Sequence, residues 1–162
     1  MSNASKRISN EAHPNCVVCG AEHLFGMRLE FALLADGSVR AAFHRGEAFE
    51  GYPGLLHGGI ISSLLDGAMT NCLYAHGQRG VTGELKVRFQ HPVMTNQGAI
   101  VRAWIDHSSP PLHVLKAEIV QEELIRANAT GKFMEQAFFE LRQKRVEELG
   151  PSSTNRMWWP TG

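Results

Sequence analysis

The stretch GYPGLLHGGIISSLLDGAMTNCLYA, residues 51–75, decides the fold of this chain. Its first four residues, 51–54, predict a turn. From 57 to about 75 the apolar residues recur at the three- and four-residue spacing of a helix, and Gly77 and Gly80 predict its end. The apolar positions cover much of the circumference, so the helix should be buried on most sides: Ile60, Ile61, Leu64, Leu65, Ala68, Met69, Cys72 and Ala75.

Alternating apolar and polar residues on both sides of this helix predict strands. Asp36-Gly37 is typical of a hairpin and separates the two strands that precede the helix. The expected strands cover about 28–33, 39–43, 84–90, 98–107, 113–123 and 127–140, and a short charged helix follows at 141–149. Two strands, one long buried helix and four more strands predict an α+β domain, in which one curved antiparallel sheet encloses the helix.

Length and composition narrow the class of protein. A chain of 162 residues suits one domain, which we place at 16–149 between a flexible segment (1–15) and a tail (150–162). Lysine and arginine equal aspartate and glutamate at 16 each, a balance that disfavours a nucleic-acid partner.

The sequence also suggests where the protein works. Residues 1–15 hold no signal-peptide core, and no later apolar run approaches the roughly 18 residues of a membrane span. Three cysteines are too few for a disulfide framework. We therefore expect a cytoplasmic protein without a membrane partner.

Gly58 and Gly59 open the predicted helix, although each glycine costs about 1 kcal/mol relative to alanine there. Without side chains, their N–H groups are open to a ligand oxygen, and the helix dipole adds positive charge. A carbonyl on these donors would be polarised and its oxyanion stabilised. Alternatively, the glycines only let the helix start pack against a strand.

Asp66 lies nine residues after His57, among apolar neighbours. Aspartate is a weak helix-interior residue, and desolvation in an enclosed helix should raise its pKa and favour a base or nucleophile. The alternative is a solvated stripe of the helix. Thr82, at the start of the next strand, offers a hydroxyl that could hold a water molecule.

Together these motifs resemble the PaaI-type hotdog thioesterases. The match is to the branch that reads G-x-P-G-x-x-H-G-G, then Asp nine residues after the His, then Thr in the next strand. It covers roughly 16–140 and is most specific over 51–92. The resemblance implies a hotdog fold, hydrolysis of an acyl-CoA thioester to free acid and CoA, and a homodimer or a homotetramer built as a dimer of dimers. No HExxH or His-rich catalytic cluster occurs, so neither a catalytic metal nor a cofactor is expected.

The resemblance also assigns roles. Asp66 would act on the thioester as nucleophile or general base, and the Gly58 and Gly59 amides would polarise its carbonyl. Thr82 would position water or the carboxylate, and His57 would anchor the loop and contact the substrate. Another branch of the family places an Asn six residues before the His, where this chain has a glycine. This difference favours the Thr-containing arrangement.

Helix geometry predicts that two chains share each site. Gly58 and Asp66 are eight residues apart, about 12 Å along a helix axis. A thioester must lie within about 3–3.5 Å of both the amide donors and the nucleophile. One helix cannot satisfy both conditions, whereas a two-fold dimer with antiparallel helices can.

His13, Cys16, Cys19 and His23 supply two imidazoles and two sulfurs within eleven residues. Zinc accepts such ligands. However, the spacing is compressed compared with the usual two-knuckle layout and no second cysteine pair exists. A thiol-rich packing turn is therefore the alternative interpretation.

Two other functions fit a hotdog domain. A dehydratase is disfavoured because no D-x-x-x-x-H spacing occurs. A non-catalytic acyl-CoA-binding module remains the alternative, although such a module gains nothing from a buried charge beside a thioester.

Coenzyme A carries phosphates, and the candidates to bind them are Arg79, Lys86, Arg88, His91 and Lys132. Periodicity does not predict the acyl chain.

Overall fold

The structure is a computed structural model that describes residues 6–8, 13–44 and 46–149. Most of the predicted flexible segment and the whole tail 150–162 lie outside the described residues. The elements are β1 (Lys6–Arg7), β2 (Ala32–Leu33), β3 (Val39–Phe43), the 3₁₀ turn η1 (Gly46–Phe49), α1 (Gly58–Ala75), β4 (Gly80–Phe89), β5 (Ala99–Ser109), β6 (Leu112–Gln121), β7 (Leu124–Glu135) and α2 (Gln136–Leu149).

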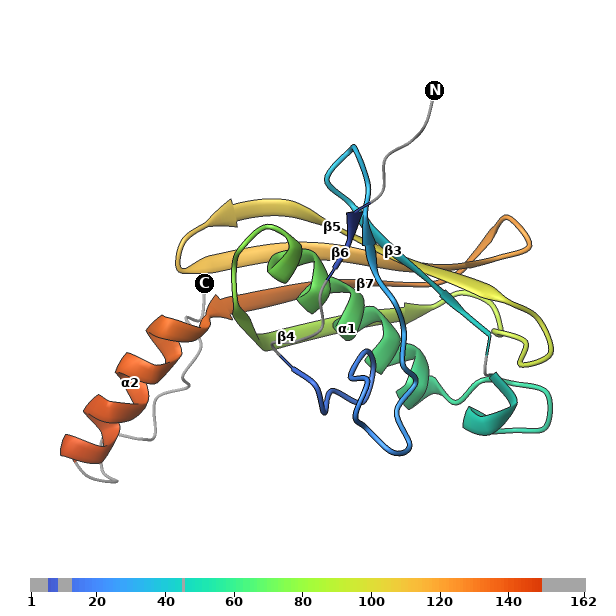
Figure 1. Cartoon of the computed structure of the whole chain (residues 1–162), viewed down its shortest axis with the longest axis horizontal. Helices are drawn as coiled ribbons and strands as arrows, with labels where there is room; N and C mark the ends of the chain where they lie inside the picture. The colour runs from blue at the N-terminus through green and yellow to red at the C-terminus, as the bar shows by residue number, and fades with distance from the viewer. Residues whose placement is uncertain (1–5, 9–12, 45, 150–162) are drawn as a thin grey trace.

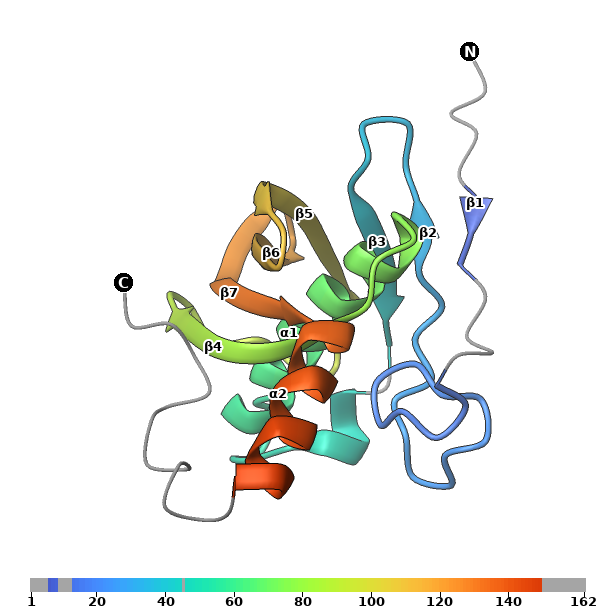
Figure 2. The same ribbon diagram turned by 90° about the vertical axis from the view of Figure 1, so that its left-hand side faces the viewer.

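The strands form one antiparallel sheet in the order β1-β2-β3-β5-β6-β7-β4. The sheet curves around α1, which lies along its concave face (Figures 1 and 2). β4 follows α1 directly but pairs only with β7, so it forms one edge of the sheet. This architecture confirms the predicted α+β hotdog fold.

Burial of α1 explains why the helix is stable in this position. Its apolar residues pack against the inward residues of β5 and β6, where alternate side chains such as Val101, Ala103, Leu115 and Ala117 are almost fully buried. His57 caps the N-terminus, and Gly77 follows the C-terminus with a φ of 75°, the left-handed conformation that suits glycine. The predicted helix limits are therefore confirmed.

The first predicted strand is only partly formed. Leu29 and Phe31 are buried as the alternation at 28–33 predicts, but only Ala32–Leu33 pairs in the sheet. The reason is that the Met27 and Leu29 N–H groups donate to the carbonyls of residues 17 and 18, at 2.7 and 2.8 Å. This segment is therefore held by the cysteine-containing loop. Within the segment expected to be flexible, Lys6–Arg7 forms β1 against β2.

The last strand is shorter than predicted. β7 stops at Glu135 rather than continuing to 140, and α2 begins at Gln136 instead of 141. The apolar pair at 138–139 fits a strand or a helix, because so short a run carries no distinctive period. A Gln136–Glu140 side-chain hydrogen bond of 2.9 Å, at helical spacing, supports the first turn of α2. In Figure 1 this helix projects away from the sheet.

Candidate active site

Asp66 lies in the middle of α1 and is half-buried. The Thr82 hydroxyl, on β4, donates a hydrogen bond to Asp66 Oδ1 over 2.8 Å. Burial raises the pKa of the Asp66 carboxyl group, with a smaller contribution from the charge of the Cys16 sulfur, while the Thr82 hydrogen bond opposes the rise. Asp66 is therefore a more basic carboxylate than an exposed aspartate, as expected of a group that accepts a proton.

The start of α1 presents an amide donor. His57 Nδ1 accepts a hydrogen bond from the Gly59 N–H over 2.9 Å, so this amide is already occupied. The Gly58 N–H has no partner among the residues that the structure describes. A Cβ at Gly58 would lie 3.6 Å from the Phe89 ring, so the open amide borders the end of β4. Of the two predicted donors, Gly58 is the one available to a carbonyl oxygen.

His57 fixes the loop that leads into the helix. Its N–H donates to the Phe49 carbonyl over 3.0 Å. A Cβ at Gly51 would lie 3.2 Å from both the Cα and the ring of His57. The glycine that distinguishes this chain from the Asn-containing branch therefore makes room for the histidine.

Glu50 is a loop-organising residue that the sequence analysis did not single out. Its Oε1 accepts hydrogen bonds from the Gly54 N–H at 3.0 Å and from the Thr95 hydroxyl at 2.8 Å. The carboxylate thus ties the turn before the helix to the segment after β4. An acidic residue directly before a glycine-rich turn was the available signal, but it is too common to be specific.

A hollow of about 450 Å³ opens beside the start of α1. His57 and Gly58 line it together with Tyr52, Phe89 and His91, and the Tyr52 and Phe89 side chains are 79% and 55% exposed. Asp66 does not line this hollow. An acyl group bound there would meet the amide donor but not the carboxylate of the same chain.

The predicted site residues therefore form two groups. Asp66 and Thr82 lie together, and His57, Gly58 and Gly59 lie together. Gly58 and Asp66 belong to one continuous helix, so about 12 Å of helix axis separates the groups. β4 borders both groups, with Thr82 at the carboxylate and Phe89 at the amide.

The candidate phosphate ligands fall into distinct places. Lys86 and Arg88 are exposed on β4, and His91 lines the hollow beside Gly58. Lys132 pairs with Glu84 at 3.3 Å, and Arg79 lies at the opposite end of β4, beyond the end of α1. Of these five candidates, His91 is the one that lines the hollow.

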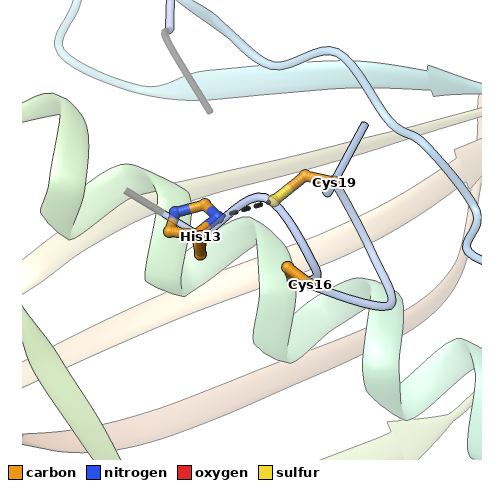
Figure 3. Close-up of side chains that lie close together, drawn as sticks. All are labelled: His13, Cys16 and Cys19. Carbon is orange, nitrogen blue, oxygen red and sulfur yellow. Dashed lines mark hydrogen bonds between the residues drawn. The ribbon is translucent and has the colours of Figure 1, made fainter. Parts of the chain in front are cut away.

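The cysteine-containing loop brings together three of its four predicted ligands. Donor atoms of His13, Cys16 and Cys19 all lie within 4.8 Å of one another, next to α1 (Figure 3). His23 does not join this group; its Nδ1 accepts a hydrogen bond from the Phe25 N–H at 3.2 Å. The four-residue set proposed from spacing is therefore reduced to three.

Comparison with known proteins finds similar proteins. Residues 53–127 match the Thioesterase superfamily. This part of the chain is therefore similar to the thioesterase superfamily, as its motifs implied. Over 114 residues it is 25% identical to acyl-coenzyme A thioesterase THEM4 of Bos taurus, covering 67% of this chain and 47% of that protein. It spans less than half the length of the curated relatives it matches.

Solved structures share the fold at low sequence identity. The thioesterase superfamily protein RHA08564 superimposes with a TM-score of 0.71 at 21% identity, over 83% of this chain and 68% of that one. PaaI of E. coli gives 0.62 at 19% identity, over 67% and 80%. A hypothetical thioesterase of Streptococcus pneumoniae, solved with coenzyme A, gives 0.59 at 20% identity, over 62% and 82%. In the described part of this chain, neither helix is both long and apolar enough to cross a membrane.

Proposed function

We propose that this domain hydrolyses acyl-CoA thioesters to the free acid and CoA, with Asp66 as the catalytic carboxylate. The observation that carries the proposal is the half-buried Asp66, whose pKa is raised by burial and whose Oδ1 is held by the Thr82 hydroxyl at 2.8 Å. Burying a charged carboxylate costs desolvation free energy, and a module that only binds acyl-CoA does not require such a group.

The reaction follows from the two groups of residues. The Asp66 carboxylate takes a proton from a water molecule, which attacks the thioester carbon, or it attacks that carbon itself. The carbonyl oxygen gains negative charge and accepts a hydrogen bond from the Gly58 N–H. Collapse of this intermediate breaks the C–S bond, and CoA leaves as a thiolate that is protonated to the thiol. If Asp66 attacks directly, an acyl-Asp66 anhydride remains, which water hydrolyses to the free acid and the regenerated carboxylate. Thr82 keeps the carboxylate oriented throughout.

A homodimer would bring the two groups together. Strand β4 is an edge strand within the chain, so its outer N–H and C=O groups can pair with a second copy. When two copies of one strand pair antiparallel about a two-fold axis, the numbers of the two residues that face each other always add up to the same value. With Thr82 facing Phe89 of the second copy, the Asp66 group of one chain approaches the Gly58 group of the other. Two equivalent sites would result.

The substrate class is supported by the relatives. THEM4 is named as an acyl-coenzyme A thioesterase, and the Streptococcus pneumoniae protein was solved with coenzyme A. In this chain, His91 lines the hollow and would contact the CoA phosphates. The hollow is bordered by aromatic side chains, which suits the acyl part of a thioester.

The test is thiol release from short, long and aromatic acyl-CoAs, followed with a thiol reagent. Wild-type protein should turn over at least one class, and the Asp66→Asn protein should not. Binding of the same acyl-CoAs is measured in parallel by calorimetry. Tight binding with no thiol release from any substrate would favour the binding module and contradict the proposal.

A further inference from the structure

The loop at residues 13–20 gathers donors that the proposed reaction does not use. His13 Nδ1 lies 3.3 Å from Cys19 Sγ, and the Cys16 donor atom is within 4.8 Å of both (Figure 3). In a tetrahedral zinc site, a histidine nitrogen and a cysteine sulfur are about 3.5 Å apart, as follows from bonds of about 2.0 and 2.3 Å. The observed spacing is close to that of ligands around one ion.

A tight turn follows Cys16 in the loop. Gly20 closes the turn through a 2.8 Å hydrogen bond from its N–H to the Cys16 carbonyl. A Cβ at Gly20 would lie only 2.3 Å from the Pro14 carbonyl oxygen, so no other residue fits.

Helix α1 supports the loop from the other side. Asn71 is buried; its side-chain amide donates to Cys19 Sγ at 3.4 Å and to the Gly67 carbonyl at 2.8 Å. Val18 packs on Gly67. A Cβ added at Gly67 would lie 2.6 Å from the Val18 side chain. A sulfur oriented by a second hydrogen-bonded residue is typical of a metal ligand.

We propose that His13, Cys16 and Cys19 bind one thiophilic divalent ion, Zn²⁺ by the nature of the donors. Two thiolates and a neutral imidazole balance the charge of the ion. No fourth donor from the described residues joins the group. The ion cross-links the loop, which is held against α1 by the Val18–Gly67 and Cys19–Asn71 contacts. Its role is to stabilise the fold, and it takes no part in hydrolysis.

The experiment uses full-length, untagged protein, kept reduced and stripped of metal with a chelator. Titration of the unfolded chain should find all three cysteines in the reduced form. Co²⁺ is then added as the probe. We expect one equivalent per chain, with thiolate-to-cobalt absorption and the intense visible bands of a tetrahedral site. Zn²⁺ should displace the cobalt and raise the melting temperature, while thioester turnover survives removal of the metal.

Variants assign the ligands. Loss of a residue that only orients a ligand typically weakens metal binding about 10- to 100-fold, so Cys16→Ser and His13→Ala should weaken zinc binding by at least that much. His23→Ala is the matched control, because this histidine lies in the same loop region but outside the cluster, and it should bind like wild type.

Two results would overturn the proposal. One is cobalt bound by the reduced wild-type protein without thiolate-to-cobalt absorption, or not bound at all. The other is equal zinc affinity in the wild-type and Cys16→Ser proteins. If Cys16→Ser does not fold, as judged by circular dichroism, the wild-type cobalt spectrum decides alone.

Discussion

The Thr82 hydroxyl hydrogen-bonds the Asp66 carboxylate over 2.8 Å and so links the edge strand β4 to the middle of the buried helix. The two residues are 16 apart in sequence, and only the turn after α1 brings them together. The same strand reaches the helix start at Phe89, beside Gly58. β4 therefore sets the positions of both groups of the proposed site.

Asp66→Asn should lower kcat for acyl-CoA hydrolysis by about 10²- to 10⁴-fold, because the amide can neither accept a proton nor attack the thioester. Binding should change little, since asparagine keeps the shape and can still accept from Thr82. Asp106→Asn is the control: this aspartate is exposed on β5, pairs with Lys116, and should leave kcat unchanged. A variant that retains more than about a tenth of wild-type turnover would exclude the assigned role.

The same Asp66→Asn substitution should raise the melting temperature at pH 7. Burial raises the folded-state pKa of Asp66 above its unfolded value, so keeping it ionised destabilises the fold. The loss of folding free energy is complete at pH values above the pKa of Asp66 in the folded protein. It vanishes as the pH falls below the pKa of Asp66 in the unfolded chain, near 3.9. Thermal melts across this range should therefore show the two proteins converging at low pH. A difference that persists or grows on acidification would contradict the buried-carboxylate account.

Thr82→Val should shift the acid limb of the kcat–pH profile to higher pH. The lost hydroxyl normally holds the pKa of Asp66 down, so its removal raises that pKa further and a larger fraction is protonated at mildly acidic pH. Thr82→Ser keeps the hydroxyl and serves as the control, with an acid limb like that of wild type. Profiles measured from pH 5 to 9 distinguish this effect from a loss of kcat at every pH, which would indicate misplacement alone.

Gly58→Pro should remove the amide donor with little damage to the helix. Proline is favoured at the first helical position, and His57 before it already has the extended conformation (φ −61°, ψ 135°) that proline requires. Loss of one such donor costs about 10²- to 10³-fold in kcat. Gly58→Ala keeps the N–H and should retain most of the activity. Comparable activity in the Gly58→Pro protein would show that this amide is not the donor.

Sharing of the site is tested by mixing Gly58→Pro and Asp66→Ala chains, each inactive alone. In a mixed dimer, one site carries both defects and the other carries neither. With half the dimers mixed at random, about a quarter of wild-type activity should return, as two-fold symmetry requires. Mass spectrometry under native conditions measures the mixed dimer. If mixed dimers form and activity does not return, each site belongs to one chain.

Gly67→Ala should destabilise the fold by about 1–3 kcal/mol, the usual cost of overpacking. The added methyl group would lie 2.6 Å from the Val18 side chain and push the cysteine-containing loop off α1. Val18→Ala in the same chain removes the obstacle and should restore part of the lost stability. Denaturant unfolding of the single and double variants measures the coupling. Additive effects would show that the loop does not rest on this glycine.

The sequence by itself determined the elements with a strong period. Apolar positions repeat every three or four residues in α1, so burial of one wide face allowed only a helix, and its limits followed from His57 and Gly77. The motif from Gly51 to Thr82 was equally informative, because glycine, histidine, aspartate and threonine at fixed spacing are rare together. Short or ambiguous runs did not predict their own secondary structure. The conformations of residues 28–33 and 136–140 depended on the segments that pack against them.

The tertiary structure decided which residues meet. Spacing could not predict that Gly59 is occupied by His57 while the Gly58 N–H has no partner among the described residues, because the histidine rotamer depends on the space left by Gly51. Nor could it separate His23 from His13, since the difference lies in the path of a loop held by Asn71 and Gly67. Local periodicity encodes burial, whereas contacts between distant segments depend on packing that no single segment contains.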